Sequence, residues 1–343
     1  MGCGASATVY PAENVPRGHE ASKSNDHDGI HGEEEKFDDK YYADVPLKKE
    51  IDKWISDLNN TSDYADHQTL RILEEMVEQI NPKDKEATIK KSNYLIKLNY
   101  AQLFLKMWHN LKNYHLVLDA SKPSGKDPTE ICAASSFDYA KVVLWHAAEC
   151  SPRMCREIGK YGIIEILLSQ LEQPEYASNK LTGTENSTPI NADKAMRSNL
   201  AILLSAIRNC SDNGHRFREA NAEEILSKYL DCQNAAIQAQ SVLILVYSLQ
   251  EVDSDPKGDE SIKVKLVNKG VLPLLVNTLA SKRSTEEHCL AATAIWTLAS
   301  HNDNKDRIRK EEGCVEALKN RQGSENTDLR TACTNALREL REG

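Results

Sequence analysis

The sequence predicts an all-α chain, in which a solenoid of stacked helical units follows a disordered N-terminal tail. From about residue 46 onward, apolar residues recur at helical spacing with almost no strict alternation. The chain has only 15 Gly and 11 Pro, which argues against an all-β fold with many tight turns. One order of helices and turns recurs several times between residues 141 and 343.

The N-terminal tail, residues 1–45, is predicted to be disordered and acidic. It mixes Gly, Ser, Asn, Asp and Glu with few large apolar side chains, so it cannot bury enough surface to offset the entropy of ordering it. Asp26 to Asp44 contains eight acidic residues and two lysines. The His and Asp side chains of residues 27–31 offer metal ligands, but such clusters in a tail are usually plain solvated chain.

The first six residues, MGCGAS, fit the pattern for N-myristoylation. Removal of Met1 would leave Gly2 as the acceptor, and Ser6 fills the favoured Ser/Thr position. One myristoyl chain binds membranes only marginally, and the tail is acidic rather than polybasic, so Cys3 is the second signal, through palmitoylation. This start resembles those of dually acylated G-protein α subunits and Src-type kinases. The resemblance implies a lipid anchor on the cytoplasmic face of a plasma membrane or endomembrane.

Composition and missing motifs exclude several function classes. A net charge of −9 disfavours binding to nucleic acid, and the longest apolar run, residues 242–249, is too short to span a bilayer. The nine cysteines are scattered without zinc spacing, as in a reducing compartment. Ser124-Gly125-Lys126 lacks the upstream Gly of a P-loop, and no kinase, hydrolase, zincin, EF-hand or Rossmann motif is present. We therefore predict no enzyme, no catalytic residue, no cofactor and no metal site.

The repeated unit reads as a long apolar helix, a short charged helix and another apolar helix, with a breakpoint before the last of these. These breakpoints are Gly162, Asn221, Gly270 and Gly313, which are residue types that accept the left-handed conformation needed for a sharp turn. They lie 59, 49 and 43 residues apart, and polar inserts at residues 172–193 and 253–260 account for the longer intervals. Without the inserts a unit has about 42 residues, within the armadillo/HEAT range.

The segment Ile262 to Ser300 resembles an armadillo repeat. It reads as a short first helix, a second helix and a long third helix, which the capping box Ser284-Thr-Glu-Glu287 opens. The resemblance covers about residues 131–343 and implies a right-handed superhelical solenoid of the armadillo/HEAT type. Residues 46–130 are helical but divergent, and are either degenerate repeats or a capping region.

By this resemblance, the third helices line a concave groove that binds extended peptides or partner helices. Peptide-binding members of the family carry a Trp and, one helical turn later, an Asn. Those positions correspond here to Trp145/Glu149, Ser205/Asn209, Tyr247/Glu251, Trp296/Ser300 and Asn335/Glu339. Three of the pairs carry Glu where the family has Asn, which suggests a helix or a basic segment as the ligand. Trp145, Tyr247 and Trp296 fit equally well as core aromatics.

A second feature is the lysine-rich stretch Lys90 to Leu118, which has five lysines and no acidic residue before Leu118. Its apolar residues surround the helix, as expected for a helix buried in the stack with lysines reaching solvent; a partner site is the alternative. It could also attract the acidic tail.

The function predicted is a membrane-tethered armadillo scaffold that binds a protein partner. The alternative is a non-enzymatic regulator of a membrane-associated GTPase or kinase.

Overall fold

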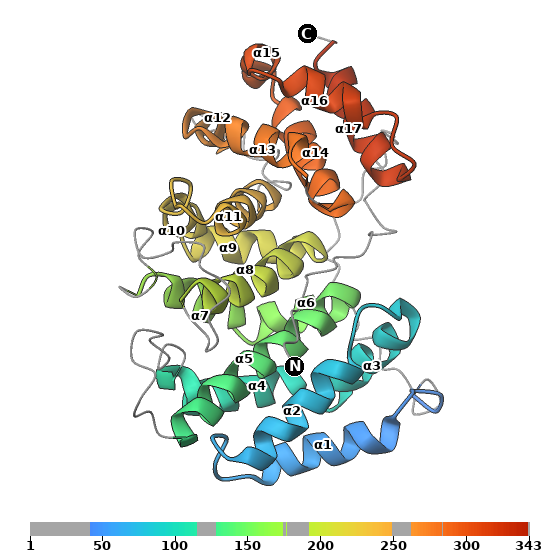
Figure 1. Ribbon diagram of the computed structural model, residues 1–343, viewed down its shortest axis with the longest axis vertical. Helices are drawn as coiled ribbons and strands as arrows, with labels where there is room; N and C mark the ends of the chain where they lie inside the picture. The colour runs from blue at the N-terminus through green and yellow to red at the C-terminus, as the bar shows by residue number, and fades with distance from the viewer. Residues whose placement is uncertain are drawn as a thin grey trace, which may run out of the picture.

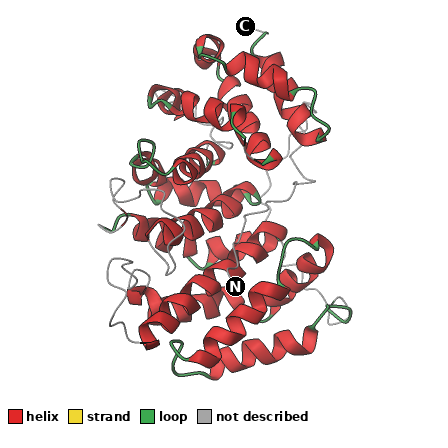
Figure 2. Cartoon of the chain, in the orientation of Figure 1, coloured by secondary structure: helices red, strands yellow, loops and turns green. Residues whose placement is uncertain are grey.

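The computed structural model describes residues 42–114, 128–173, 176, 192–248, 262–282 and 284–341. Within these ranges the regular elements are helices, and no strand occurs (Figure 2). They form one elongated stack that runs from α1 at one end to α17 at the other (Figure 1). Gly2, Cys3 and the rest of the tail up to residue 41 lie outside the described residues. None of the described helices is long and apolar enough to cross a bilayer.

The C-terminal half of the chain, from residue 152 onward, consists of three-helix units in the predicted order. Each has a short first helix, a second helix and a third helix, and the four units follow one another directly. They are α6 Pro152–Lys160, α7 Ile163–Leu171 and α8 Ala192–Arg208; α9 Gly214–Glu219, α10 Ala222–Ser227 and α11 Ala235–Tyr247; α12 Ile262–Asn268, α13 Val271–Ala280 and α14 Thr285–Ala299; α15 Asn302–Lys310, α16 Cys314–Arg321 and α17 Thr327–Glu339.

The corner between the first and second helix of each unit has left-handed backbone geometry. The φ angles are 71° at Gly162, 55° at Asn221, 84° at Gly270 and 73° at Gly313. Only Gly, and to a lesser degree Asn, adopts this conformation at low steric cost. The breakpoints read from the sequence are therefore confirmed. The capping box at Ser284 is also confirmed, because its hydroxyl accepts from the Glu287 backbone N–H while the Glu287 carboxylate accepts from the Ser284 backbone N–H.

The N-terminal helices have the same kind of corner at two positions that the sequence analysis did not single out. Asn99 has a φ of 57° and Leu47 has a φ of 59°. Asn99 separates the first two helices of the triplet α3 Lys85–Lys97, α4 Tyr100–Leu111 and α5 Pro128–Cys150, whereas Leu47 precedes the pair α1 Lys48–Asn60 and α2 His67–Gln79. The lysine-rich stretch is thus two helices rather than the one helix expected, because its chain reverses at Asn99.

The third helices pack in series along the stack. Helix α2 lies against α5, α5 against α8, α8 against α11, α11 against α14, and α14 against α17. Between the helices the apolar side chains form a continuous core, exemplified by Trp108 and Phe137, whose rings meet edge to face at 5.1 Å. Burying one such side chain contributes about 1.5–3 kcal/mol. Every unit therefore depends on its neighbours for its core.

Candidate protein-binding face

The predicted groove residues lie at the C-terminal ends of the third helices. Nine of the ten are described: Trp145 and Glu149 on α5, Ser205 on α8 with Asn209 directly after it, Tyr247 on α11, Trp296 on α14 with Ser300 directly after it, and Asn335 and Glu339 on α17. Glu251 lies outside the described residues. Because the third helices pack in series, these positions form a single row along the stack, which we call the third-helix face.

Between α5 and α8 the structure brings three of these residues together with Arg208. The Ser205 hydroxyl donates to Glu149 Oε2 at 2.6 Å, and the Arg208 guanidinium donates to Glu149 Oε1. Only 8% of the Glu149 side chain and 9% of the Arg208 side chain is exposed. A charge buried to this degree requires a charged or hydrogen-bonded partner. The Glu149 carboxylate is therefore neutralised within the protein.

Asn209 also links neighbouring helices. Its Nδ2 donates to the carbonyl oxygens of Ala148 at 3.0 Å and Glu149 at 3.3 Å, at the C-terminal end of α5. The last carbonyls of a helix have no partner within that helix, so a side-chain amide here satisfies groups that would otherwise need water. The amide that the family resemblance assigns to a ligand backbone is engaged with the adjacent helix.

The aromatic residues differ in burial along the face. Tyr247 is 9% exposed, while Trp145 and Trp296 are half-buried against the core. The ring of Trp145 lies 5.2 Å from that of His146, whose Nδ1 is 2.7 Å from the Ile80 carbonyl oxygen. Burial lowers the pKa of His146, which favours its neutral form. His146 thus takes part in packing between α2 and α5.

In the C-terminal part of the face, basic residues of the first helices reach the ends of the third helices. Lys263 on α12 is buried, and its Nζ donates to Ser300 Oγ at 3.0 Å. Lys305 Nζ on α15 lies 4.0 Å from Glu339 Oε2, with 10% and 26% of the two side chains exposed. A cation near a helix C-terminus complements the helix dipole.

Sequence reasoning did not find Arg208, Lys263 or Lys305. A signal existed for Lys263, because it lies between two apolar residues, Ile262 and Val264, where an ordinary solvated lysine is unexpected. Their partners lie 34 to 59 residues away, so the pairing depends on tertiary packing.

One cysteine–histidine pair has the geometry of a reactive dyad. Cys132 Sγ lies 3.1 Å from His67 Nδ1. Burial raises the pKa of Cys132, and the carboxylates of Asp66 and Glu74 raise it further, so the thiol stays protonated. The pair therefore lacks the electropositive surroundings of an activated nucleophile. Among the described residues no group of three or more His, Cys, Asp or Glu side chains could hold a metal ion.

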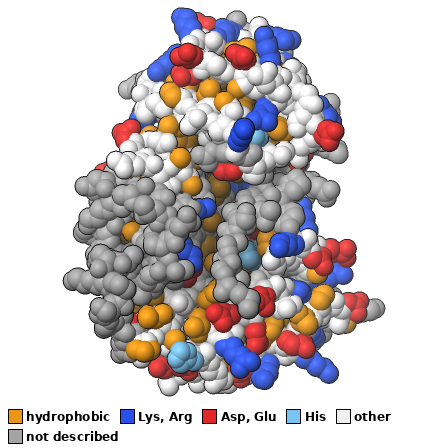
Figure 3. Space-filling view, viewed as in Figure 1, with side chains coloured by type: hydrophobic (Ala, Val, Ile, Leu, Met, Phe, Trp, Pro, Cys, Tyr) orange, Lys and Arg blue, Asp and Glu red, His pale blue; other side chains and the backbone are white. Residues whose placement is uncertain are grey.

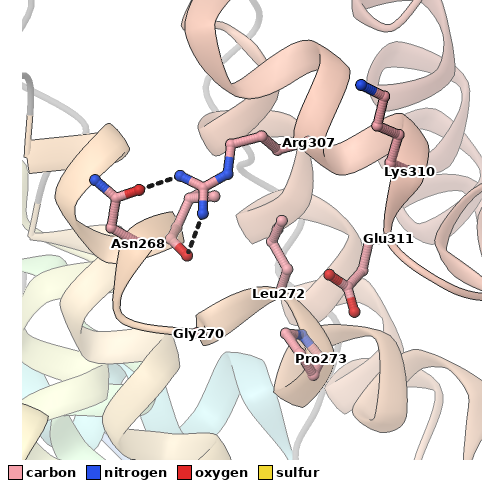
Figure 4. Close-up of a pocket in the computed structure, with 8 residues that line it drawn as sticks. Asn268, Gly270, Leu272, Pro273, Arg307, Lys310 and Glu311 are labelled. Carbon is pink, nitrogen blue, oxygen red and sulfur yellow. Dashed lines mark hydrogen bonds between the residues drawn. The ribbon is translucent and has the colours of Figure 1, made fainter.

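A cavity of about 390 Å³ lies between the α12–α13 corner and the α15–α16 corner. The Arg307 guanidinium crosses toward α12, where it donates to the Asn268 side chain and to the Val267 carbonyl oxygen (Figure 4). Leu272 and Pro273 also line the cavity, and Glu311 lies beside Pro273 (Figure 4). Arg307 thereby joins two consecutive units.

A scan against protein-family models gives no match, and a search of curated protein sequences gives none. Solved structures do match. The designed armadillo repeat protein YIII(Dq)4CqI has a TM-score of 0.53 and 16% identity, covering 86% of this chain and 100% of that one. An engineered protein of the Northeast Structural Genomics Consortium has a TM-score of 0.53 and 15% identity, covering 85% and 96%.

A third structure is the designed armadillo repeat protein YIII(Dq.V1)4CPAF in complex with peptide (KR)4. It has a TM-score of 0.50 and 16% identity, and covers 86% of this chain and 99% of that one. Together with the order of the helices, these similarities show that the chain has an armadillo-type fold. The fold class predicted from the sequence is thereby confirmed.

Proposed function

We propose that this protein is a membrane-tethered armadillo-type scaffold that binds a protein segment on the C-terminal part of its third-helix face. The observation that carries the proposal is the contrast between two parts of that face. Where α5 meets α8, the polar groups are already engaged: the Ser205 hydroxyl donates to the Glu149 carboxylate, and the Asn209 amide donates to a backbone carbonyl at the end of α5. On α14 and α17, Trp296 and Asn335 are half-buried on adjacent helices.

Trp296 and Asn335 supply the two chemistries that peptide recognition needs. A Trp ring offers a large apolar area at a small cost in conformational entropy, and Trp is enriched among residues that dominate binding energy. An Asn amide can both donate to and accept from a peptide backbone. The armadillo neighbour solved with a (KR)4 peptide supports peptide binding as a use of this fold.

The charges favour a partner segment that is recognised by its apolar side chain and its backbone rather than by a run of basic residues. Glu149 is paired with Arg208, and Glu339 lies near Lys305. Lys and Arg side chains are interspersed with Asp and Glu at both ends of the body in the space-filling view (Figure 3). A regular acidic ladder, which would select a basic segment, is therefore not formed by these residues.

Peptide display against the full-length protein tests this proposal. We expect that selected peptides bind at least about tenfold more weakly to Asn335→Ala and to Trp296→Ala, the loss typical of a residue that dominates an interface. Trp145→Ala, at the equivalent position of α5, is the matched control and should retain binding. Thermal melting of each variant separates lost binding from lost folding. Equal loss with all three variants would contradict the proposed location.

The membrane part of the proposal rests on the N-terminal pattern. We propose that Gly2 is myristoylated and Cys3 palmitoylated, which would hold the protein on the cytosolic leaflet of a membrane. Intact-mass spectrometry of the protein from eukaryotic cells should show both acyl groups. Fractionation should place Gly2→Ala in the soluble pool and Cys3→Ser between soluble and membrane pools. An unmodified Gly2 would remove the membrane tether and leave the binding face untouched.

A further inference from the structure

The chain enters the solenoid against the end of α3. Tyr42, the first described residue, is 5% exposed, and its ring centroid lies 5.5 Å from that of Tyr94. Lys97 Nζ lies 4.9 Å from the Tyr42 ring centroid, a cation–π distance. The tail therefore leaves the body at a fixed point beside Lys97.

A row of basic side chains continues from that point along α4. Lys106 and His109 are exposed on one side of α4, whereas Leu103, Phe104 and Met107 on the other side are buried in the core. Exposed Lys97 precedes the corner at Asn99 and exposed Lys112 follows the helix. We call Lys97, Lys106, His109 and Lys112 the lysine row. Residues 87–114 contain no Asp or Glu, and the acidic residue of α3, Glu86, pairs with Lys90 near the start of that helix.

The tail has the complementary charge at the right distance. Residues 26–39 contain seven acidic residues and one lysine, and Asp39 lies only three residues before Tyr42. An extended chain covers about 3.3 Å per residue, so the nine residue steps from Glu33 to Tyr42 reach about 30 Å. A twelve-residue helix such as α4 is only about 18 Å long. The acidic segment can therefore lie along the whole row.

We propose that residues 26–39, the acidic tail segment, dock along the lysine row on the outer side of α3 and α4. Attachment at Tyr42 gives the segment an effective concentration near the row on the order of millimolar, so weak ion pairs suffice. An anionic lipid surface is the less favoured occupant, because the adjacent carboxylates repel it. With residues 26–39 docked, only residues 1–25 would separate the N-terminus from the body. The docking does not depend on acylation.

Zero-length carbodiimide coupling of the unacylated full-length protein tests the docking, since it joins only carboxylates and amines in direct contact. Mass spectrometry should find the acidic tail segment coupled to Lys97, Lys106 and Lys112. These products should disappear in about 0.5 M salt, where screening acts within a few ångströms. Lys106→Glu should lower the remaining coupling to Lys97 and Lys112 about fivefold, and combining it with Glu34→Lys should restore association.

Lys319→Glu is the matched control, because Lys319 is an exposed lysine on the second helix of the last unit. It should leave the coupling pattern unchanged. Tail coupling that is absent, or equally strong to Lys319 and to the lysine row, would overturn the proposal. Absent coupling together with weaker binding of Lys106→Glu to phosphatidylserine vesicles would assign the row to lipid instead. None of these outcomes depends on Gly2 or on the third-helix face.

Discussion

Two boundaries between consecutive units are held together in different ways. Where α5 meets α8, buried polar groups cross the interface: Glu149 binds Arg208, and Lys141 Nζ donates to the Ala195 carbonyl oxygen at 3.4 Å. Where α11 and its unit meet α12–α14, Lys269 Nζ donates to Glu223 Oε1 at 2.9 Å. The Lys269 and Glu223 side chains are 37% and 36% exposed, so this contact lies at the surface.

The difference shows that the stack is not uniform. Buried charge pairs require exact placement of both partners and so fix how two units sit, whereas exposed pairs are screened by water and contribute little. In a solenoid each unit contacts only its neighbours, so the strength of one boundary does not compensate for that of another. We therefore expect substitutions at the α5–α8 boundary to cost much more than those at the α11–α14 boundary.

The largest effect is expected from Glu149→Ala. This change leaves Arg208 buried without its carboxylate, and breaking a buried pair in this way costs about 3–5 kcal/mol. Urea unfolding monitored by circular dichroism measures the loss. The double variant Glu149→Met with Arg208→Met should recover most of it, because two apolar side chains need no partner. A loss below about 1 kcal/mol for Glu149→Ala would make the two boundaries equivalent.

The second effect is a pH dependence at the same boundary. Burial lowers the pKa of Lys141 to about 8, against 10.5 for an ordinary lysine; Asp138 partly opposes this shift and Lys194 adds to it. Between pH 8 and 10.5 the unfolded chain binds the extra proton, so the free energy of unfolding should rise with pH, by about 3 kcal/mol at 1.36 kcal/mol per pKa unit. Below pH 8 this contribution is constant.

Unfolding in urea at a series of pH values between 7 and 10.5 measures that rise. The control is Lys141→Met, which should lack the Lys141 contribution. A wild-type profile that matches the Lys141→Met profile would show that the lysine is not held in an apolar site.

Asn209→Ala should have a smaller effect, about 1 kcal/mol, because it removes hydrogen bonds to the end of α5 that water can partly replace. Asn335→Ala on α17 is the comparison, and we expect it to change the melting temperature less. If the two variants melt alike and Asn209→Ala loses peptide binding as Asn335→Ala does, Asn209 belongs to the ligand site and the binding face extends to α8.

The smallest effect is expected from Lys269→Ala at the α11–α14 boundary. An exposed ion pair contributes about 0.2–1 kcal/mol, and salt screens it further. The free energy of unfolding should therefore change by less than about 1 kcal/mol, and Glu223→Ala should behave the same way. A loss as large as that of Glu149→Ala would contradict the distinction between the two boundaries.

The sequence was informative where local geometry restricts the residue type. Gly162, Asn221, Gly270 and Gly313 were predictable as corners because few residues accept a left-handed backbone. Leu47 adopts the same conformation although a leucine there carries a steric penalty, so no residue preference could reveal that corner. Asn99 was not predicted as a corner, because apolar residues such as Ile96, Tyr100 and Leu103 continue at helical spacing across it.

The binding face was harder to predict, because its residues depend on partners that are distant in sequence. The family resemblance assigned Glu149 and Asn209 to the ends of third helices, and the structure has them there. The resemblance could not reveal that Arg208, 59 residues after Glu149, neutralises it, or that the Asn209 amide bonds to α5. Such pairing is decided by how two helices pack, which spacing along one helix does not encode.

The left-handed corners divide the chain into repeat units that begin at equivalent positions. Gly270 and Gly313 occupy equivalent corners in successive units. Excising or duplicating the stretch between them therefore joins a first helix to a second helix, as in the native chain. We expect the result to keep the order of the helices and to change the length of the stack by one unit. The span of the protein should therefore be adjustable in steps of one unit.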